Sequence, residues 1–80
     1  MNGIISKAAL EARRARYPVG CRVALVRTSD PYTTLVPGEL GTVDFLDSIG
    51  TIFVNWDNGS TLGMAFGEDY VVRVDMRSDT

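Results

Sequence analysis

The chain has 80 residues, of which 45% are hydrophobic and 22% are charged, and its net charge is −2. This length predicts a single domain with a thin core, and the composition is too apolar for a chain that is disordered throughout. The longest apolar runs are a few residues, far short of the roughly 20 needed to cross a bilayer, and the N-terminus does not resemble a signal peptide. The single cysteine, Cys21, excludes an internal disulfide, so these features together predict a cytoplasmic protein without a membrane segment.

The charge is divided unevenly along the chain. Residues 1–29 contain six basic residues and one acidic residue, net +5, whereas residues 30–80 contain two basic and nine acidic residues, net −7. A broad nucleic-acid surface normally needs a basic face, so the acidic second part argues against nucleic-acid binding without excluding it.

Residues 5–17 are expected to form an N-terminal helix. Ser6 is a suitable N-cap, the following run is rich in helix formers, and Pro18 should end the helix near Arg16. One side of this helix is apolar but shallow; it comprises Ile4, Ile5, Ala8, Ala12 and Ala15. Such a helix needs a partner surface. It is therefore the predicted docking or self-association element, and the sequence leaves open whether it packs on its own domain.

Strand-like alternation follows from Gly20 onward. Five strands are predicted, over residues 22–27, 40–46, 51–56, 60–64 and 70–74. In the second strand, Val43 and Phe45 should share a face. The pair Asn58-Gly59 predicts a two-residue hairpin turn between the third and fourth strands.

The long connection over residues 28–39 contains two turn signals and should form an ordered loop. The predicted fold is therefore mostly β: a small five-stranded SH3-like barrel over residues 18–75. One α-helix within residues 1–17 precedes it, and a frayed tail at 76–80 follows. An OB-like barrel is the alternative, but the chain has no room for a helix between the third and fourth strands.

Three stretches of this sequence resemble a bacterial and phage family known as domain of unknown function 4314. The likeness covers about residues 17–74, and its most distinctive parts are Asp30-Pro-Tyr-Thr33 with the later Pro37-Gly38, and the hairpin Trp56-Asp-Asn-Gly59. The resemblance implies an SH3-like barrel carried on mobile elements, and it implies little about activity. Parts of the chain are also similar to a protein-recognition barrel of ubiquitin ligases and to the KOW barrels of ribosomal and transcription proteins.

No catalytic motif is evident. The chain has no histidine, its lone cysteine cannot form a two-cysteine metal or redox site, and it lacks a phosphate-binding glycine pattern. Asp57, Glu68 and Asp69 could approach one another for acid–base work, but they are better explained as turn and loop residues. The sequence thus predicts no enzyme activity, no metal and no cofactor.

The first candidate binding residues lie in the long loop: Asp30, Tyr32 and Thr33. Tyr32 either offers an aromatic platform beside Asp30, or it packs the loop onto the barrel while Asp30 caps the turn.

A second group surrounds the hairpin and the last strand. Trp56 either anchors a partner at the surface or completes the core. Tyr32, Trp56 and Tyr70 could contribute to a groove for a proline-rich peptide, although the acidic-aromatic motif of peptide-binding SH3 domains is absent. Asn58, in the hairpin turn, is a further candidate binding residue.

The third group is Arg13, Arg14 and Arg16 at the end of the helix. These arginines could bind phosphate or a nucleotide, or they could be solvated side chains that complement the helix dipole.

The expected function is that of a non-catalytic protein-binding module from a phage or mobile element. Its partner would be a host factor that it inhibits, or a second copy bound through the helix. One alternative is a KOW-like barrel that binds nucleic acid. Another is a sequestering protein for a small nucleotide signal, with Arg13, Arg14 and Tyr32 lining a pocket between copies.

Overall fold

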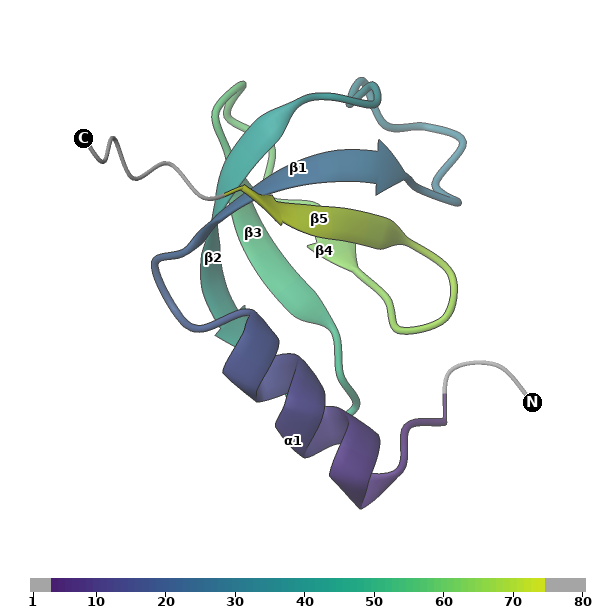
Figure 1. Cartoon of the computed structure of the whole chain (residues 1–80). Coiled ribbons are helices and arrows are strands. Elements are labelled where there is room, and N and C mark those ends of the chain that lie inside the picture. Colours follow the sequence, from purple (N-terminus) through teal and green to yellow (C-terminus); the bar gives the residue numbers. More distant parts are fainter. Residues whose placement is uncertain (1–3, 75–80) are drawn as a thin grey trace.

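The computed structural model describes residues 4–74 of the chain. One N-terminal helix precedes five strands, which form a single antiparallel sheet bent into a barrel-like shape (Figure 1). The elements are α1 (Lys7–Arg16), β1 (Arg22–Arg27), β2 (Leu40–Leu46), β3 (Ile52–Trp56), β4 (Gly63–Met64) and β5 (Tyr70–Val74). The predicted mostly-β fold of five strands after one helix is confirmed. The tail predicted at 76–80 lies outside the described residues, as does residue 75.

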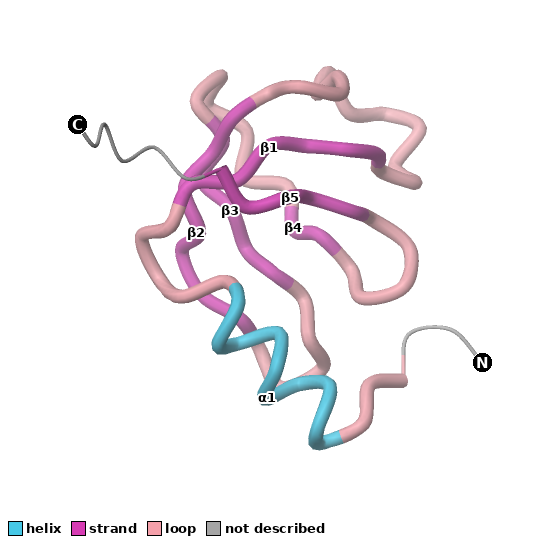
Figure 2. The backbone as a smooth tube through the Cα atoms, in the orientation of Figure 1, coloured by secondary structure: helices cyan, strands magenta, loops and turns pink. Residues whose placement is uncertain are grey.

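The sheet has the strand order β4-β3-β2-β1-β5, so the chain forms a meander from β1 to β4 and then returns beside β1 (Figure 2). Ala24 of β1 lies opposite Leu40 of β2 on one side and opposite Val72 of β5 on the other. Because β5 pairs only with β1, it is an edge strand of the sheet.

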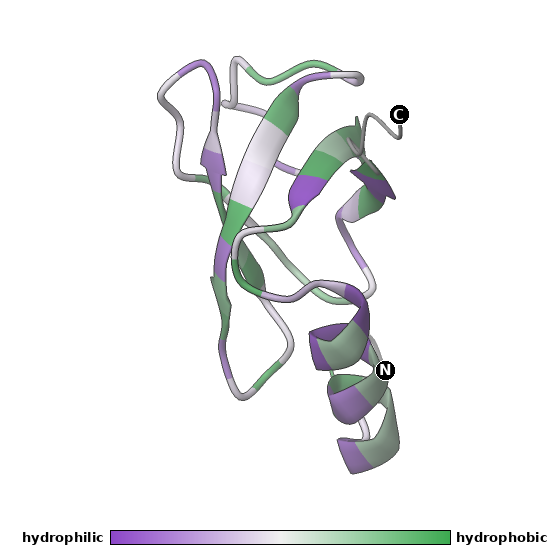
Figure 3. Ribbon diagram, turned by 60° about the vertical axis from the view of Figure 1, so that its left-hand side comes forward, coloured by the Kyte–Doolittle hydropathy of each residue, from purple (hydrophilic) through white to green (hydrophobic). Residues whose placement is uncertain are grey.

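The core consists of the inward-facing strand residues together with two residues from outside the sheet. The buried apolar residues are Tyr17, Val23, Leu25, Leu35, Val43, Ile52, Val54, Trp56, Met64 and Val71. Tyr17 follows the helix and Leu35 belongs to the loop over 28–39, so both connecting segments are held to the barrel by burial of an apolar side chain. Figure 3 shows the alternation of apolar and polar residues along the strands as green and purple bands.

The hairpin between β3 and β4 differs from the predicted two-residue turn. Trp56 N–H donates to the carbonyl of Ser60 at 2.9 Å, and Gly59 N–H donates to the carbonyl of Trp56 at 2.9 Å. These bonds enclose three loop residues, 57–59. Gly59 has φ 97°, a conformation that side-chain-bearing residues rarely adopt, which explains the glycine there.

A β-bulge in β2 changes which face Phe45 occupies. Val43 pairs with Val54, but Phe45 pairs with Phe53, so Asp44 is an extra residue in the ladder. The expectation that Val43 and Phe45 share a face is therefore wrong: Val43 is buried, whereas Phe45 is exposed and stacks on Phe53 with ring centroids 4.5 Å apart. A bulge reverses the alternation of side chains beyond it.

Helix α1 begins and ends as predicted. The Ser6 hydroxyl accepts a hydrogen bond from Ala9 N–H at 3.1 Å, and the helix ends at Arg16, two residues before Pro18. With ten residues, α1 is too short to cross a membrane, and residues 4–74 contain no other helix.

The helix packs on its own barrel, but of the predicted side only Ile5, just before α1, is partly buried, where it lies against Gly50. Ala8, Ala12 and Ala15 are exposed, whereas the partly buried residues of α1 are Ala9, Leu10 and Arg13. The contact is decided by the long side chains of Arg13 and Tyr17, which reach the barrel where alanines cannot. Self-association through the exposed alanine side stays a prediction.

Candidate functional site

The loop over 28–39 is fastened to the barrel by one carboxylate. Asp69, which immediately precedes β5, is 7% exposed. Its Oδ1 atom accepts hydrogen bonds from Ser29 N–H at 2.6 Å, from the Ser29 hydroxyl at 3.0 Å and from the Thr28 hydroxyl at 3.1 Å. Its Oδ2 atom accepts one from Ala65 N–H at 2.9 Å. Asp69 thus joins the end of β1 to the turn between β4 and β5.

These hydrogen bonds keep Asp69 ionised. Burial by itself would raise the pKa of a carboxyl group. Here the donors from Ser29, Ala65 and Thr28 outweigh burial, and the net effect lowers the pKa of Asp69 below its ordinary value. The carboxylate is therefore a structural anchor and is not poised to exchange a proton near neutral pH.

The apex of the loop is ordered by short-range contacts. Asp30 accepts a hydrogen bond from Tyr32 N–H at 2.8 Å, and the Thr33 hydroxyl accepts one from Leu35 N–H at 3.1 Å. Leu35 is buried in the core. Asp30 thus caps the turn, as one of the two interpretations predicted, but Tyr32 does not pack on the barrel: it is 91% exposed.

The three residues predicted around the hairpin and the last strand have different surroundings. Trp56 is 3% exposed and its indole N–H donates to the Leu62 carbonyl at 2.9 Å, so it is a core residue and the surface-anchor interpretation is wrong. Asn58 accepts a hydrogen bond from Ser60 N–H within the turn. Tyr70 is partly exposed on β5, and the Arg27 guanidinium lies 5.5 Å from its ring centroid.

The three helix arginines have separate surroundings. Arg13 Nε donates to the Gly50 carbonyl at 2.8 Å, and its guanidinium lies 5.4 Å from the ring centroid of Phe66. Burial lowers the pKa of Arg13 from its usual very high value. Arg16 lies over Tyr17, and Arg14 faces the end of β2. In Figure 1, α1 lies at the end of the molecule opposite the 28–39 loop, so one chain does not bring these arginines together with Tyr32.

The predicted carboxylates face different groups. Asp57 forms the only ion pair within residues 4–74, with Arg22 at 2.6 Å, and hydrogen bonding to Arg22 lowers the pKa of Asp57. Asp69 instead faces backbone and hydroxyl donors.

Burial raises the pKa of the Cys21 thiol despite the nearby charge of Arg73, which disfavours a thiolate nucleophile. No cluster of three metal-ligating side chains occurs in the described part of the chain.

Sequence reasoning missed Asp69 and Leu35. In the sequence, Asp69 resembles any acidic residue of a loop, because its main hydrogen-bond partners, Thr28 and Ser29, lie 41 and 40 positions earlier. Leu35 lies in an irregular stretch between Thr34 and Val36-Pro37, so no periodicity marks it as core. The aliphatic pair Leu35-Val36 in a long loop was the one available signal, since a buried side chain can hold a loop in place.

Comparison with known proteins gives one match. The family model described as "Domain of unknown function (DUF4314)" matches residues 6–74. No curated protein and no solved structure matches the chain. The match includes the residues of α1, which the resemblance placed outside its strongest part. The chain therefore belongs to the DUF4314 family.

Proposed function

We propose that this protein is a non-catalytic module that binds another protein through the loop over 28–39. The observation that carries the proposal is Tyr32, which is 91% exposed on a loop whose base and flanks are hydrogen-bonded or buried. An exposed tyrosine on an ordered loop gives large contact area and loses little conformational entropy on binding. Tyrosine is also enriched among the residues that dominate the energy of protein interfaces.

The charge around the loop indicates the chemistry of the partner. Asp30, Glu39 and Glu68 are acidic residues in or next to the loop segments, and none of them forms an ion pair within residues 4–74. A partner surface with lysine or arginine would complement these carboxylates, and a cation could also lie over the open ring of Tyr32. The resemblance to proteins of mobile elements favours a host protein, whose activity the binding would block.

The two alternative functions have less support. A nucleic-acid surface normally needs a broad basic face, yet residues 30–80 have a net charge of −7, and two of the basic residues, Arg22 and Arg13, are engaged by Asp57 and by Gly50 and Phe66. The small cleft lined by Arg14, Tyr17, Pro18, Val19 and Leu46 does not include Tyr32, so a nucleotide site that uses Tyr32 with Arg13 and Arg14 would have to form between copies. Binding that weakens steeply with salt would favour nucleic acid.

Site-specific photo-crosslinking tests the proposal. Tyr32 is replaced by p-benzoyl-phenylalanine in the full chain, and the same replacement at exposed Ser48, in the turn between β2 and β3, is the control. We expect an adduct with a host protein at position 32 and none at position 48.

The captured protein is then purified and its affinity measured directly. Tyr32→Ala should weaken binding by about thirtyfold, as for an interface residue worth about 2 kcal/mol. Absence of a specific adduct at position 32, or equal affinity of Tyr32→Ala and the unaltered protein, would refute the proposal.

A further inference from the structure

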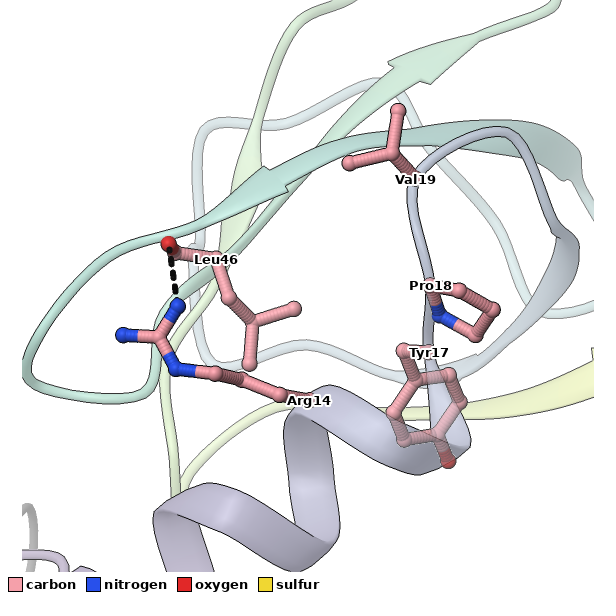
Figure 4. A pocket seen from close by; sticks show the side chains of 5 residues that line it. All are labelled: Arg14, Tyr17, Pro18, Val19 and Leu46. Carbon is pink, nitrogen blue, oxygen red and sulfur yellow. Dashed lines mark hydrogen bonds between the residues drawn. The ribbon is translucent and has the colours of Figure 1, made fainter.

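A small cleft lies at the junction of the helix and the barrel. Figure 4 shows it between the last turn of α1, the linker that follows and the end of β2. It has a volume of about 140 Å³ and is lined by Arg14, Tyr17, Pro18, Val19 and Leu46. Four of these five side chains are mainly apolar, and the fifth carries a guanidinium at the rim (Figure 4).

The wall formed by the linker is held in place by backbone hydrogen bonds. Gly20 N–H donates to the Val43 carbonyl at 2.8 Å, and Cys21 N–H donates to the Pro18 carbonyl at 3.1 Å. Gly20 has φ 91°, which lets the chain turn sharply there. Pro18 and Val19 are therefore fastened to β2, and the cleft exists before anything binds.

Val19 is 73% exposed although it lines the cleft. Leu46, across the cleft, is only partly buried. An apolar group that entered the cleft would remove surface of both residues from water, which is favourable in proportion to the area covered.

The guanidinium of Arg14 has unused hydrogen-bonding capacity. One of its nitrogens lies 3.5 Å from the Leu46 carbonyl oxygen, at the long limit of a hydrogen bond. No carboxylate of residues 4–74 pairs with it. The acidic residue on the same helix is Glu11, and those at the facing end of β2 are Asp44 and Asp47. One oxygen of Asp47 already accepts hydrogen bonds from Ile49 and Thr51 N–H. Arginine binds carboxylates strongly because two parallel N–H groups match the two oxygens.

We propose that this cleft binds the C-terminal residue of a partner polypeptide when that residue is apolar. A C-terminal aliphatic residue carries its side chain and its carboxylate on the same Cα atom. The side chain can therefore fill the cleft while the carboxylate binds Arg14. The volume of about 140 Å³ suits one such side chain, since a cavity of about 150 Å³ holds a benzene molecule. It is smaller than the roughly 300–1,000 Å³ of pockets that enclose whole ligands, which disfavours a nucleotide.

The test uses two tripeptides and one tetrapeptide as probes, and the backbone amide resonances of the isotope-labelled full chain as the readout. The first probe is acetyl-Gly-Ser-Leu with a free carboxylate, and the second is the same peptide with a C-terminal amide. A third, acetyl-Gly-Ser-Asp-Leu amide, carries its carboxylate on an internal side chain.

We expect saturable shifts of the Val19 and Leu46 amides with the free-acid peptide, with a dissociation constant in the millimolar range. The amide should bind at least about tenfold more weakly, because it lacks the charge-assisted bond to Arg14. Arg14→Gln should weaken binding of the acid to a similar extent. Arg27→Gln removes an exposed arginine that ends β1, lies over Tyr70 and does not line the cleft, so it is the matched control and should bind normally.

Four results would overturn the proposal. The first three are no saturable shift, equal binding of acid and amide, and full binding by Arg14→Gln. The fourth is equal binding of the internal-carboxylate peptide, which would show that a chain terminus is not required. The cleft is independent of the Tyr32 loop, so Tyr32→Ala should bind the tripeptide normally even though it impairs the proposed protein interaction.

Discussion

The Oδ1 atom of Asp69 accepts a hydrogen bond from the backbone N–H of Ser29 at 2.6 Å, across 40 positions of sequence. This contact joins the start of β5 to the start of the loop that presents Tyr32. Because the acceptor is a carboxylate that is almost completely buried, the bond is stronger than one between neutral groups. The order of the loop therefore depends on a residue outside it.

Replacing Asp69 by Asn should destabilise the protein by about 2–4 kcal/mol, because an amide cannot accept from both Ser29 and Ala65 through two oxygens. Chemical denaturation measures this change. Glu68→Gln, an exposed neighbour, is the control and should change stability by less than about 0.5 kcal/mol. If Asp69→Asn proved as stable as the unaltered protein, the anchor role would be wrong.

Stability should also fall in acid, and Asp69 should account for part of the fall. The pKa of Asp69 in the folded protein lies below its ordinary value. Its stabilising effect is therefore complete above the unfolded value of about 4, and it is lost as the pH falls through the lower folded value. Asp57 contributes in the same direction, since Arg22 lowers its pKa. Denaturation curves between about pH 2 and 7 should show a shallower fall for Asp69→Asn, whereas an unchanged slope would contradict the assignment.

Tyr17→Phe and Tyr70→Phe remove the same hydroxyl from two environments. The Tyr17 hydroxyl donates to the Val71 carbonyl at 3.2 Å in a buried setting, whereas that of Tyr70 donates to the Gly67 carbonyl at 3.2 Å in an exposed one. We expect Tyr17→Phe to cost about 1–3 kcal/mol, because a buried carbonyl loses its partner on the edge strand. Tyr70→Phe should cost less than about 0.5 kcal/mol. Equal thermal shifts would show that the helix end does not protect β5.

Arg13→Gln should loosen the helix without unfolding the barrel. It removes the 2.8 Å bond to Gly50 and the guanidinium over Phe66, which hold α1 against the sheet. Hydrogen exchange should then accelerate by about tenfold or more at the α1 amides, while amides of β1 to β3 keep their protection. Arg16→Gln, on the exposed side, is the control. Uniform acceleration in helix and sheet would mean that the two unfold together.

Gly41→Ala should destabilise the barrel by about 1–3 kcal/mol through overpacking. An added Cβ atom would lie 2.5 Å from a Val54 methyl carbon and 3.1 Å from the Asn55 carbonyl oxygen, so backbone as well as side chains must shift. Denaturant midpoints measure the loss, with exposed Thr61→Ala as the control. A neutral effect would indicate that β3 moves away from β2 easily.

Local patterns in the chain were enough to predict the type and order of the elements. Ser6 and Pro18 bound the helix through capping and steric effects that act over a few residues. Alternating apolar residues predict the strands for the same reason, because side chains in a strand point to opposite faces in turn. The mostly-β fold follows from such short-range rules. So does the buried position of Trp56, which was one of its two predicted positions.

Contacts between distant segments decided the rest. The bulge at Asp44 turned Phe45 outward, which the alternation of β2 alone could not reveal. The helix packed through Arg13, whose acceptor on Gly50 lies 37 positions away, and left Ala8, Ala12 and Ala15 exposed. Tyr32 is exposed because Leu35 and Asp69 hold the loop without it. These outcomes depend on which polar partners and apolar gaps the folded barrel offers, and those are formed only when the strands come together.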